Sequence, residues 1–141
     1  MSHTCHNLLI HCMDFRLHED IKNWMQNQGI LGDTDLVSVA GAGKDIINPE
    51  WPLYREYVLR QVQLSIKLHD MKRVILMHHT DCGAYGGKSA FGGSPEKEEQ
   101  KHIADMQGAA ALLKQKWPDL QVSLVLAKME GDKVVEFKEI G

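Results

Sequence analysis

The sequence predicts a single α/β domain in which a mostly parallel four-stranded sheet carries helices on both faces and a fifth, antiparallel strand on one edge. Three observations favour this fold. Short apolar runs alternate with segments of helical periodicity, an order typical of strands joined by crossover helices. The apolar runs are nearly continuous, as in parallel strands that are buried on both faces. The 141 residues contain no repeat and no linker, which fits one domain over 1–141.

The first two strands are predicted to flank one helix. Residues 7–13 (NLLIHCM) form a short apolar run and predict the first strand. Apolar side chains recur at helical spacing over 17–25, and Gly29 marks the end of this helix. Residues 35–40 (DLVSVA) predict the second strand, which leads into the glycine-bearing stretch AGAGKD.

A longer helix follows and leads into the third strand. Asn48 and Pro49 have the pattern of a helix start, in which a capping side chain precedes a proline in the first turn. Apolar residues then continue at four-residue steps as far as Ile66, so we expect the helix to extend to this region. Residues 73–78 (RVILMH) predict the third strand.

The last third of the chain repeats this order. Ser94 and Pro95 form a second cap-plus-proline pair, and the acidic residues after them suit the positive first turn of a helix. Pro118 ends this helix. Residues 121–127 predict the fourth strand, and 133–137, after a short turn, predict the fifth strand on an edge of the sheet.

Composition excludes several classes of partner. Net charge is -3 and the chain has no basic tract, so we expect no nucleic acid as a partner. No apolar run approaches the roughly 20 residues of a membrane span, and the first residues lack the pattern of a signal peptide. Three cysteines cannot form a fully paired disulfide framework, so we expect reduced thiols in the cytoplasm that serve metal binding or catalysis.

The first predicted strand ends in residues that packing does not explain. Cys12, Asp14 and Arg16 point to one side if the chain stays extended there. Arg16 can hold Asp14 in a forked ion pair that keeps the carboxylate ionised and oriented. A thiol with a charged pair beside it suits a metal site.

The third predicted strand ends in HHTDCG, which offers further metal ligands. His79 and Cys82 can converge on one cation if the chain turns, and Gly83 would help that turn. His78 is an alternative, because the parity of a buried strand does not choose between the two histidines. With Cys12, the set contains two thiolates and one imidazole, which suits one zinc ion and leaves a fourth, open position.

Other thiols and imidazoles have simpler interpretations. Cys12 alone is typical of a small buried hydrophobe, and a single H-x-x-C match is weak, so the argument depends on the two strand ends together. Cys5, with His3 and His6, forms a second cluster that we interpret as a frayed N-terminus. The remaining histidines are expected at the surface or in the core with their hydrogen bonds made: His11, His18, His69 and His102.

The two motifs, Cys12-x-Asp14-x-Arg16 and His79-x-x-Cys82-Gly83, resemble the pair that forms the zinc site of the β-class carbonic anhydrases. The resemblance implies zinc held by Cys12, His79 and Cys82, with Asp14 and Arg16 as the catalytic dyad. It implies reversible hydration of carbon dioxide to bicarbonate by zinc-bound hydroxide. Asp14 either accepts a hydrogen bond from that hydroxide or takes the fourth zinc position and blocks it.

The stretch that would shape the substrate pocket departs from this family. Ser38 and Val39 stand where the family carries Arg-Asn, and no counterpart of its N-terminal arm or substrate-binding glutamine is visible. The predicted pocket residues are Ala40, Gly41, Gly83 and Tyr85, with Trp51 and Tyr54 as further candidates that core packing would also explain.

The resemblance also implies a homodimer or higher homo-oligomer, because pockets in this family are completed across an interface. Two other functions remain open for the same scaffold. One is a zinc hydrolase acting on carbonyl sulfide or carbon disulfide, since the same hydroxide would serve. The other is a zinc-binding protein without turnover, which the missing arm and Arg-Asn pair favour.

Overall fold

The computed structural model describes residues 3–141. Its strands are β1 (Asn7–His11), β2 (Thr34–Ser38), β3 (Arg73–His79), β4 (Gln121–Glu130) and β5 (Lys133–Ile140). Its helices are α1 (His18–Asn27), α2 (Lys44–Ile47), α3 (Pro52–His69) and α4 (Pro95–Lys116). Short 3-10 turns are η1 (Phe15–Leu17), η2 (Gly83–Tyr85) and η3 (Lys88–Phe91).

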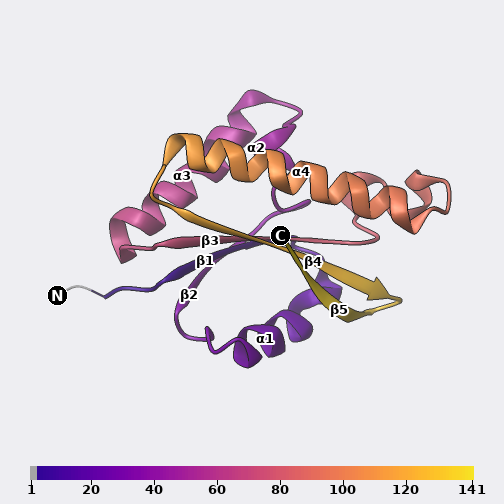
Figure 1. Cartoon of the computed structure of the whole chain (residues 1–141), viewed down its shortest axis with the longest axis horizontal. Helices are drawn as coiled ribbons and strands as arrows, with labels where there is room; N and C mark the ends of the chain where they lie inside the picture. The colour runs from indigo at the N-terminus through magenta and orange to yellow at the C-terminus, as the bar shows by residue number, and fades with distance from the viewer. Residues whose placement is uncertain (1–2) are drawn as a thin grey trace.

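The five strands form one sheet in the order β2-β1-β3-β4-β5. The first four are parallel, and β5 pairs antiparallel with β4 at one edge. Helices α2, α3 and α4 lie on one side of the sheet and α1 lies on the other (Figure 1). The predicted fold class is therefore confirmed, including the fifth, antiparallel edge strand.

The central strand β3 packs on both faces at once. Val74 and Leu76 belong to a core that also contains residues of α2, α3 and α4, whereas Ile75 and Met77 belong to a second core with residues of α1. All four side chains are buried. A strand between two cores must be apolar on both faces, which explains why the run lacks polar alternation.

The start of α3 differs from the prediction. Asn48 ends the short helix α2, which the sequence analysis did not identify, and α3 begins at Pro52. The residue before a proline is disfavoured in the helical conformation, so Pro49 ends α2 at Asn48 and cannot open the next helix there. Pro52 occupies the first turn of α3 instead. The predicted cap at Ser94 is confirmed, because its side chain accepts a hydrogen bond from the Lys97 N–H.

The strand order places a topological switch point between β1 and β3. From β1 the chain runs to β2 on one side, then crosses to β3 on the other. In open parallel sheets, the crevice beyond the carboxyl ends of such strands is the usual place for a ligand site. Among residues 3–141, no helix combines the length and apolar character that crossing a membrane requires.

Candidate metal centre

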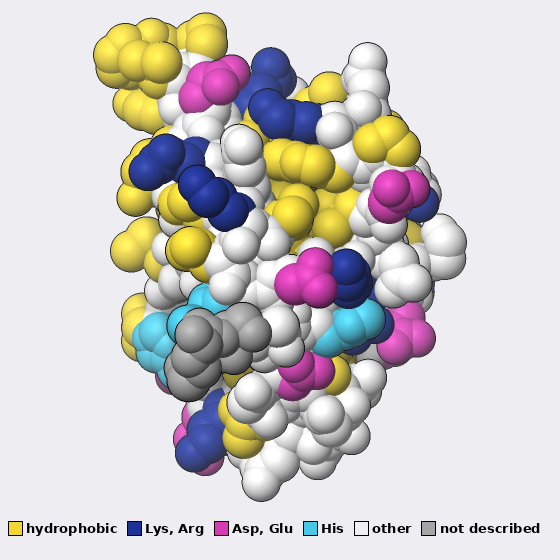
Figure 2. Space-filling model, turned by 90° about the vertical axis from the view of Figure 1, so that its left-hand side faces the viewer, with side chains coloured by type: hydrophobic (Ala, Val, Ile, Leu, Met, Phe, Trp, Pro, Cys, Tyr) yellow, Lys and Arg dark blue, Asp and Glu magenta, His cyan; other side chains and the backbone are white. Residues whose placement is uncertain are grey.

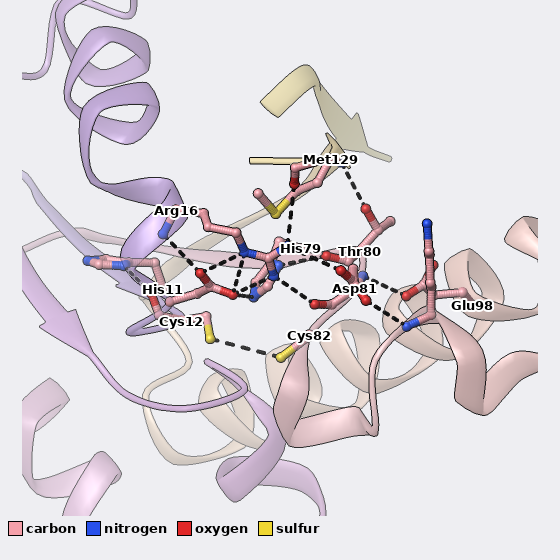
Figure 3. A network of polar contacts seen from close by, with 12 residues as sticks. His11, Cys12, Arg16, His79, Thr80, Asp81, Cys82, Glu98 and Met129 are labelled. Atoms are coloured by element: carbon pink, nitrogen blue, oxygen red, sulfur yellow. Dashed lines mark hydrogen bonds and ion pairs between the residues drawn. The ribbon is translucent and has the colours of Figure 1, made fainter. Parts of the chain in front are cut away.

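Two thiols and an imidazole meet beyond the carboxyl ends of β1 and β3. Cys12 directly follows β1, His79 is the last residue of β3, and Cys82 opens the turn η2. Because β1 and β3 are paired in parallel, their ends lie side by side. One ligand atom from each of the three buried side chains lies within 4.8 Å of the other two. Figure 3 shows the sulfurs of Cys12 and Cys82 facing one another.

The imidazole of His79 is oriented for a metal ion. Its Nδ1 lies 2.7 Å from the carbonyl oxygen of Thr80, which can only accept, so Nδ1 carries the proton. Nε2 therefore presents a lone pair, and it is buried without a hydrogen-bond partner among the described residues. A buried polar atom without a partner is costly, and a bound cation at Nε2 would remove that cost.

The two sulfurs also fit zinc. They lie 3.9 Å apart, and two sulfurs bound at about 2.3 Å to a tetrahedral zinc ion would be about 3.8 Å apart. A hydrogen bond from the Cys82 thiol lowers the pKa of Cys12, and the thiolate so formed raises the pKa of Cys82. Backbone hydrogen bonds from Gly41 and Asp14 also lower the pKa of Cys12. The donor set and its environment thus suit a cation that binds thiolates.

An ion pair lies beside these three residues. The guanidinium of Arg16 donates to both carboxylate oxygens of Asp14, with Nη2–Oδ2 at 2.6 Å and Nε–Oδ1 at 3.0 Å. These hydrogen bonds from Arg16 lower the pKa of Asp14 to about 2, so the carboxylate is ionised at neutral pH. Asp14 Oδ2 is 3.8 Å from His79 Nε2, which places the carboxylate next to the candidate metal position.

Arg16 is itself held by a residue that the sequence analysis did not single out. Its Nη1 donates to Asp81 Oδ2 at 3.1 Å and its Nη2 donates to the Asp81 carbonyl at 3.0 Å. The Asp81 N–H in turn donates to Glu98 Oε2 at 2.7 Å. Asp81 adopts a left-handed backbone conformation with φ 56°. Its place inside the HTDC stretch was the available signal, since a second carboxylate there can anchor the Arg16 guanidinium.

The structure distinguishes the two adjacent histidines. The Gly43 N–H donates to His78 Nε2 at 3.0 Å, so the proton of His78 is on Nδ1, which donates to His102 Nδ1 at 3.0 Å. Both nitrogens of His78 are therefore engaged on the α4 side of the sheet. Burial lowers the pKa of His78 to about 3 and keeps the ring neutral. His79 is thus the histidine that lies with the two cysteines.

The predicted pocket residues are placed in different ways. Gly83 lines an open depression with Asp14 and Arg16, bordered by the exposed side chains of Met13 and Phe15. Gly87 and Gly86 complete the glycine-rich side of this depression.

Gly41 has a close-packing role. It has φ 77°, and a Cβ there would lie 3.0 Å from the Cβ of Ala84, so it allows the loop after β2 to approach η2. Ala40 is exposed beside it. Tyr85 packs on His102 with ring centroids 4.4 Å apart, and its hydroxyl donates to Asp105 Oδ2 at 2.8 Å. The aromatic ring of Tyr85 therefore supports α4, and it is absent from the lining of the depression.

The other histidines partly match the expectation. His18 is exposed, and His11 is buried with Nδ1 2.8 Å from the Cys12 carbonyl oxygen. His69 is bonded to Asp35. His102 differs, because it is buried and its Nε2 has no hydrogen-bond partner among residues 3–141.

The fold and the site define an α/β protein with a candidate thiolate–imidazole metal centre at the switch point of a parallel sheet. The model of a family described as "putative carbonic anhydrase" matches residues 2–135, so the chain belongs to this family. An uncharacterized protein of Rickettsia conorii is 31% identical over 128 residues, which cover 88% of this chain and 68% of the relative. An uncharacterized protein of Rickettsia bellii is 31% identical over 126 residues, covering 88% and 77% respectively.

Two solved structures share the fold. A carbonic anhydrase from Streptococcus mutans has a TM-score of 0.65 at 19% identity, over 99% of this chain and 84% of that one. The β-carbonic anhydrase CcaA has a TM-score of 0.56 at 16% identity, over 99% and 85%. At these identities the likeness establishes the fold, which is that of β-class carbonic anhydrases.

Proposed function

We propose that this chain is a zinc enzyme that interconverts carbon dioxide and bicarbonate. The observation that carries the proposal is the buried convergence of Cys12, His79 and Cys82, with the Asp14–Arg16 ion pair beside it. Membership of a carbonic anhydrase family supports the same class of reaction. One zinc ion per chain, held by these three side chains, would supply a Lewis acid that brings the pKa of water toward about 7.

The remaining residues have roles that follow from their contacts. Asp14 is ionised and oriented by Arg16, so it can accept a hydrogen bond from the attacking water and turn a lone pair toward carbon dioxide. Arg16, anchored by Asp81, keeps Asp14 in this orientation. The depression beside Gly83 leaves the ion pair accessible to a small molecule.

The sequence at the end of β2 favours a second candidate function. Ser38 and Val39 occupy the place where the resembled family carries Arg-Asn, so the side of the pocket that selects the substrate differs. A zinc hydrolase acting on carbonyl sulfide or carbon disulfide would use the same three ligands and the same Asp14. A zinc-binding protein without turnover is the third outcome that the experiment below distinguishes.

The test combines zinc content with isotope exchange between carbon dioxide and water on the purified protein. We expect close to one catalytic-site zinc, fast exchange, and loss of exchange in Asp14→Ala with zinc retained. Cys12→Ser should lose this zinc. Zinc without exchange at neutral and alkaline pH would contradict the proposal. In that case, turnover confined to carbonyl sulfide or carbon disulfide would identify the hydrolase, and no turnover would identify a binding protein.

We further infer that residues 1–141 act as one β-carbonic-anhydrase-like zinc domain that works as a homodimer or higher homo-oligomer. The exposed apolar side chains of Met13 and Phe15 border the depression, which supports completion of the pocket by a second copy. The three cysteines are free thiols, which supports a reducing compartment such as the cytoplasm.

A further inference from the structure

A second group of candidate metal ligands lies at the opposite end of the sheet. Cys5 precedes β1, Asp35 belongs to β2 and His69 ends α3, yet one ligand atom from each lies within 4.8 Å of the other two. The run of extended chain from Cys5 to Cys12 is on the order of 20 Å long, so this cluster is separate from the candidate catalytic centre. Figure 2 faces this end of the molecule and shows histidine side chains at two places on it.

The N-terminal segment is held in place here, which differs from the frayed end that the sequence predicts. The Cys5 N–H donates to the His69 carbonyl at 3.0 Å, and the His6 N–H donates to Asp33 Oδ1 at 2.9 Å. The His6 carbonyl accepts from the Lys72 N–H at 2.9 Å. These bonds fix the backbone of Cys5 against the end of α3, so the position of its thiol relative to His69 is defined.

The carboxylate of Asp35 is oriented in the way that metal ligands are. Its Oδ2 accepts hydrogen bonds from Ser65 Oγ and His69 Nδ1, both at 2.7 Å. A partner that donates to a ligating carboxylate fixes the orientation of that ligand, which is the role Ser65 can serve.

The cluster also combines groups that a cation would stabilise together. The ring of His3 lies beside that of His69, with centroids 4.9 Å apart. One sulfur, one carboxylate oxygen and one imidazole nitrogen form a donor set that zinc accepts.

We propose that Cys5, Asp35 and His69 bind a second divalent transition-metal ion of the zinc type. The ion would join the N-terminal segment, the edge strand β2 and the end of α3, three parts of the chain that are distant in sequence. Its role would be structural, because it would hold these three parts of the chain together. The proposal does not depend on carbon dioxide turnover at the other end of the sheet.

The experiment counts zinc ions bound per chain after equilibrium dialysis of the purified protein against buffered free zinc. We expect two for the wild type and one for Cys5→Ser/His69→Ala, with the exchange activity unchanged. His18→Ala, which removes an exposed histidine outside both clusters, should keep two. Equal zinc content in the wild type and in Cys5→Ser/His69→Ala would overturn the proposal.

Two further measurements keep the test independent of the catalytic centre and of folding defects. In Cys12→Ser/Cys82→Ser, one zinc ion should remain and should raise the melting temperature when added, because binding to the folded state stabilises it. Ser65→Ala leaves every proposed ligand in place, so we expect it to retain the site with about 10–100-fold weaker zinc binding. No zinc in the first variant, or unaltered affinity in the second, would count against the site as described.

Discussion

At the scale of single residues, the neighbouring histidines of β3 have opposite environments. His78 uses both nitrogens, one as an acceptor from Gly43 and one as a donor to His102. His79 donates only from Nδ1, and its buried Nε2 has no partner among the described residues. Alternation along the strand separates the two rings onto opposite faces of the sheet, so identical side chains acquire different chemistry.

These environments predict different consequences of substitution. His79→Ala should lose the catalytic-site zinc, because it removes the only imidazole of that set. His78→Ala should retain this zinc and lower the free energy of unfolding by about 1–3 kcal/mol, because it leaves the buried N–H of Gly43 unpaired. Zinc analysis and chemical denaturation of both variants provide the test, and loss of zinc only in His78→Ala would reverse the assignment.

Arg16 provides a second prediction at this scale. Its planar guanidinium binds Asp14 with two nitrogens and reaches Asp81 at the same time, which a lysine ammonium cannot reproduce. We expect Arg16→Lys to keep its zinc but to lower kcat/KM for carbon dioxide on the order of 10²-fold. Lys22→Arg on α1 serves as a control for the reverse exchange and should leave kcat/KM unchanged. Full activity in Arg16→Lys would show that orientation of Asp14 does not limit the reaction.

At the scale of elements, α4 is tied to the sheet edge by a carboxylate that bridges two strands. Glu99 Oε1 lies 2.6 Å from Lys138 Nζ on β5 and 3.4 Å from Lys128 Nζ on β4. The hydrogen bond from Lys138, with the charge of Lys128, lowers the pKa of Glu99. A carboxylate whose pKa is lowered by folding stabilises the folded state at pH values above the ordinary glutamate pKa. This stabilisation is lost as the pH falls through the lowered pKa of the folded state.

We therefore expect Glu99→Gln to lower the free energy of unfolding at pH 7 by about 0.5 kcal/mol, since solvent screens a partly exposed pair. The difference from the wild type should shrink as the pH falls below about 4, where the unfolded chain becomes protonated first, and should be lost once Glu99 is protonated in the folded state too. Urea denaturation across this pH range measures it. Glu56→Gln, an exposed position on α3, should show no such dependence. A difference for Glu99→Gln that persists at low pH would contradict the ion-pair explanation.

Element boundaries show where local sequence signals compete. A proline occurs at two places where a helix could begin, in the pairs Asn48-Pro49 and Trp51-Pro52. Only the second pair begins a helix, α3. The pattern could not reveal α2, because a helix of four residues has too few positions to show periodicity. Ser94 with Pro95 had no competing proline nearby, and that start was predicted correctly.

At the scale of the whole molecule, the sequence predicts what depends on strand order and little of what depends on loops. Parallel pairing of β1 with β3 brings Cys12 to His79 and Cys82, so two short motifs were enough to place all three together. Asp81 was indicated only by its place in the HTDC stretch, and the hydrogen bond from Tyr85 to Asp105 on α4 is encoded by no local pattern. Cys5, Asp35 and His69 come from three separate elements and share no motif at all.

The surface next to the candidate metal centre leads to a prediction about assembly. Phe15 is 78% exposed and Met13 is 59% exposed, and these two large apolar side chains border the depression beside the candidate metal centre. If a second copy covers them, Phe15→Ser should shift the protein toward monomer and reduce exchange activity, because the pocket would lose its outer wall. Sedimentation velocity over a range of concentrations measures the shift. Val135→Ser removes a comparably exposed side chain, at 58%, from the edge strand β5 and should leave assembly intact. A wild-type protein that is monomeric yet fully active would place the complete pocket within one chain.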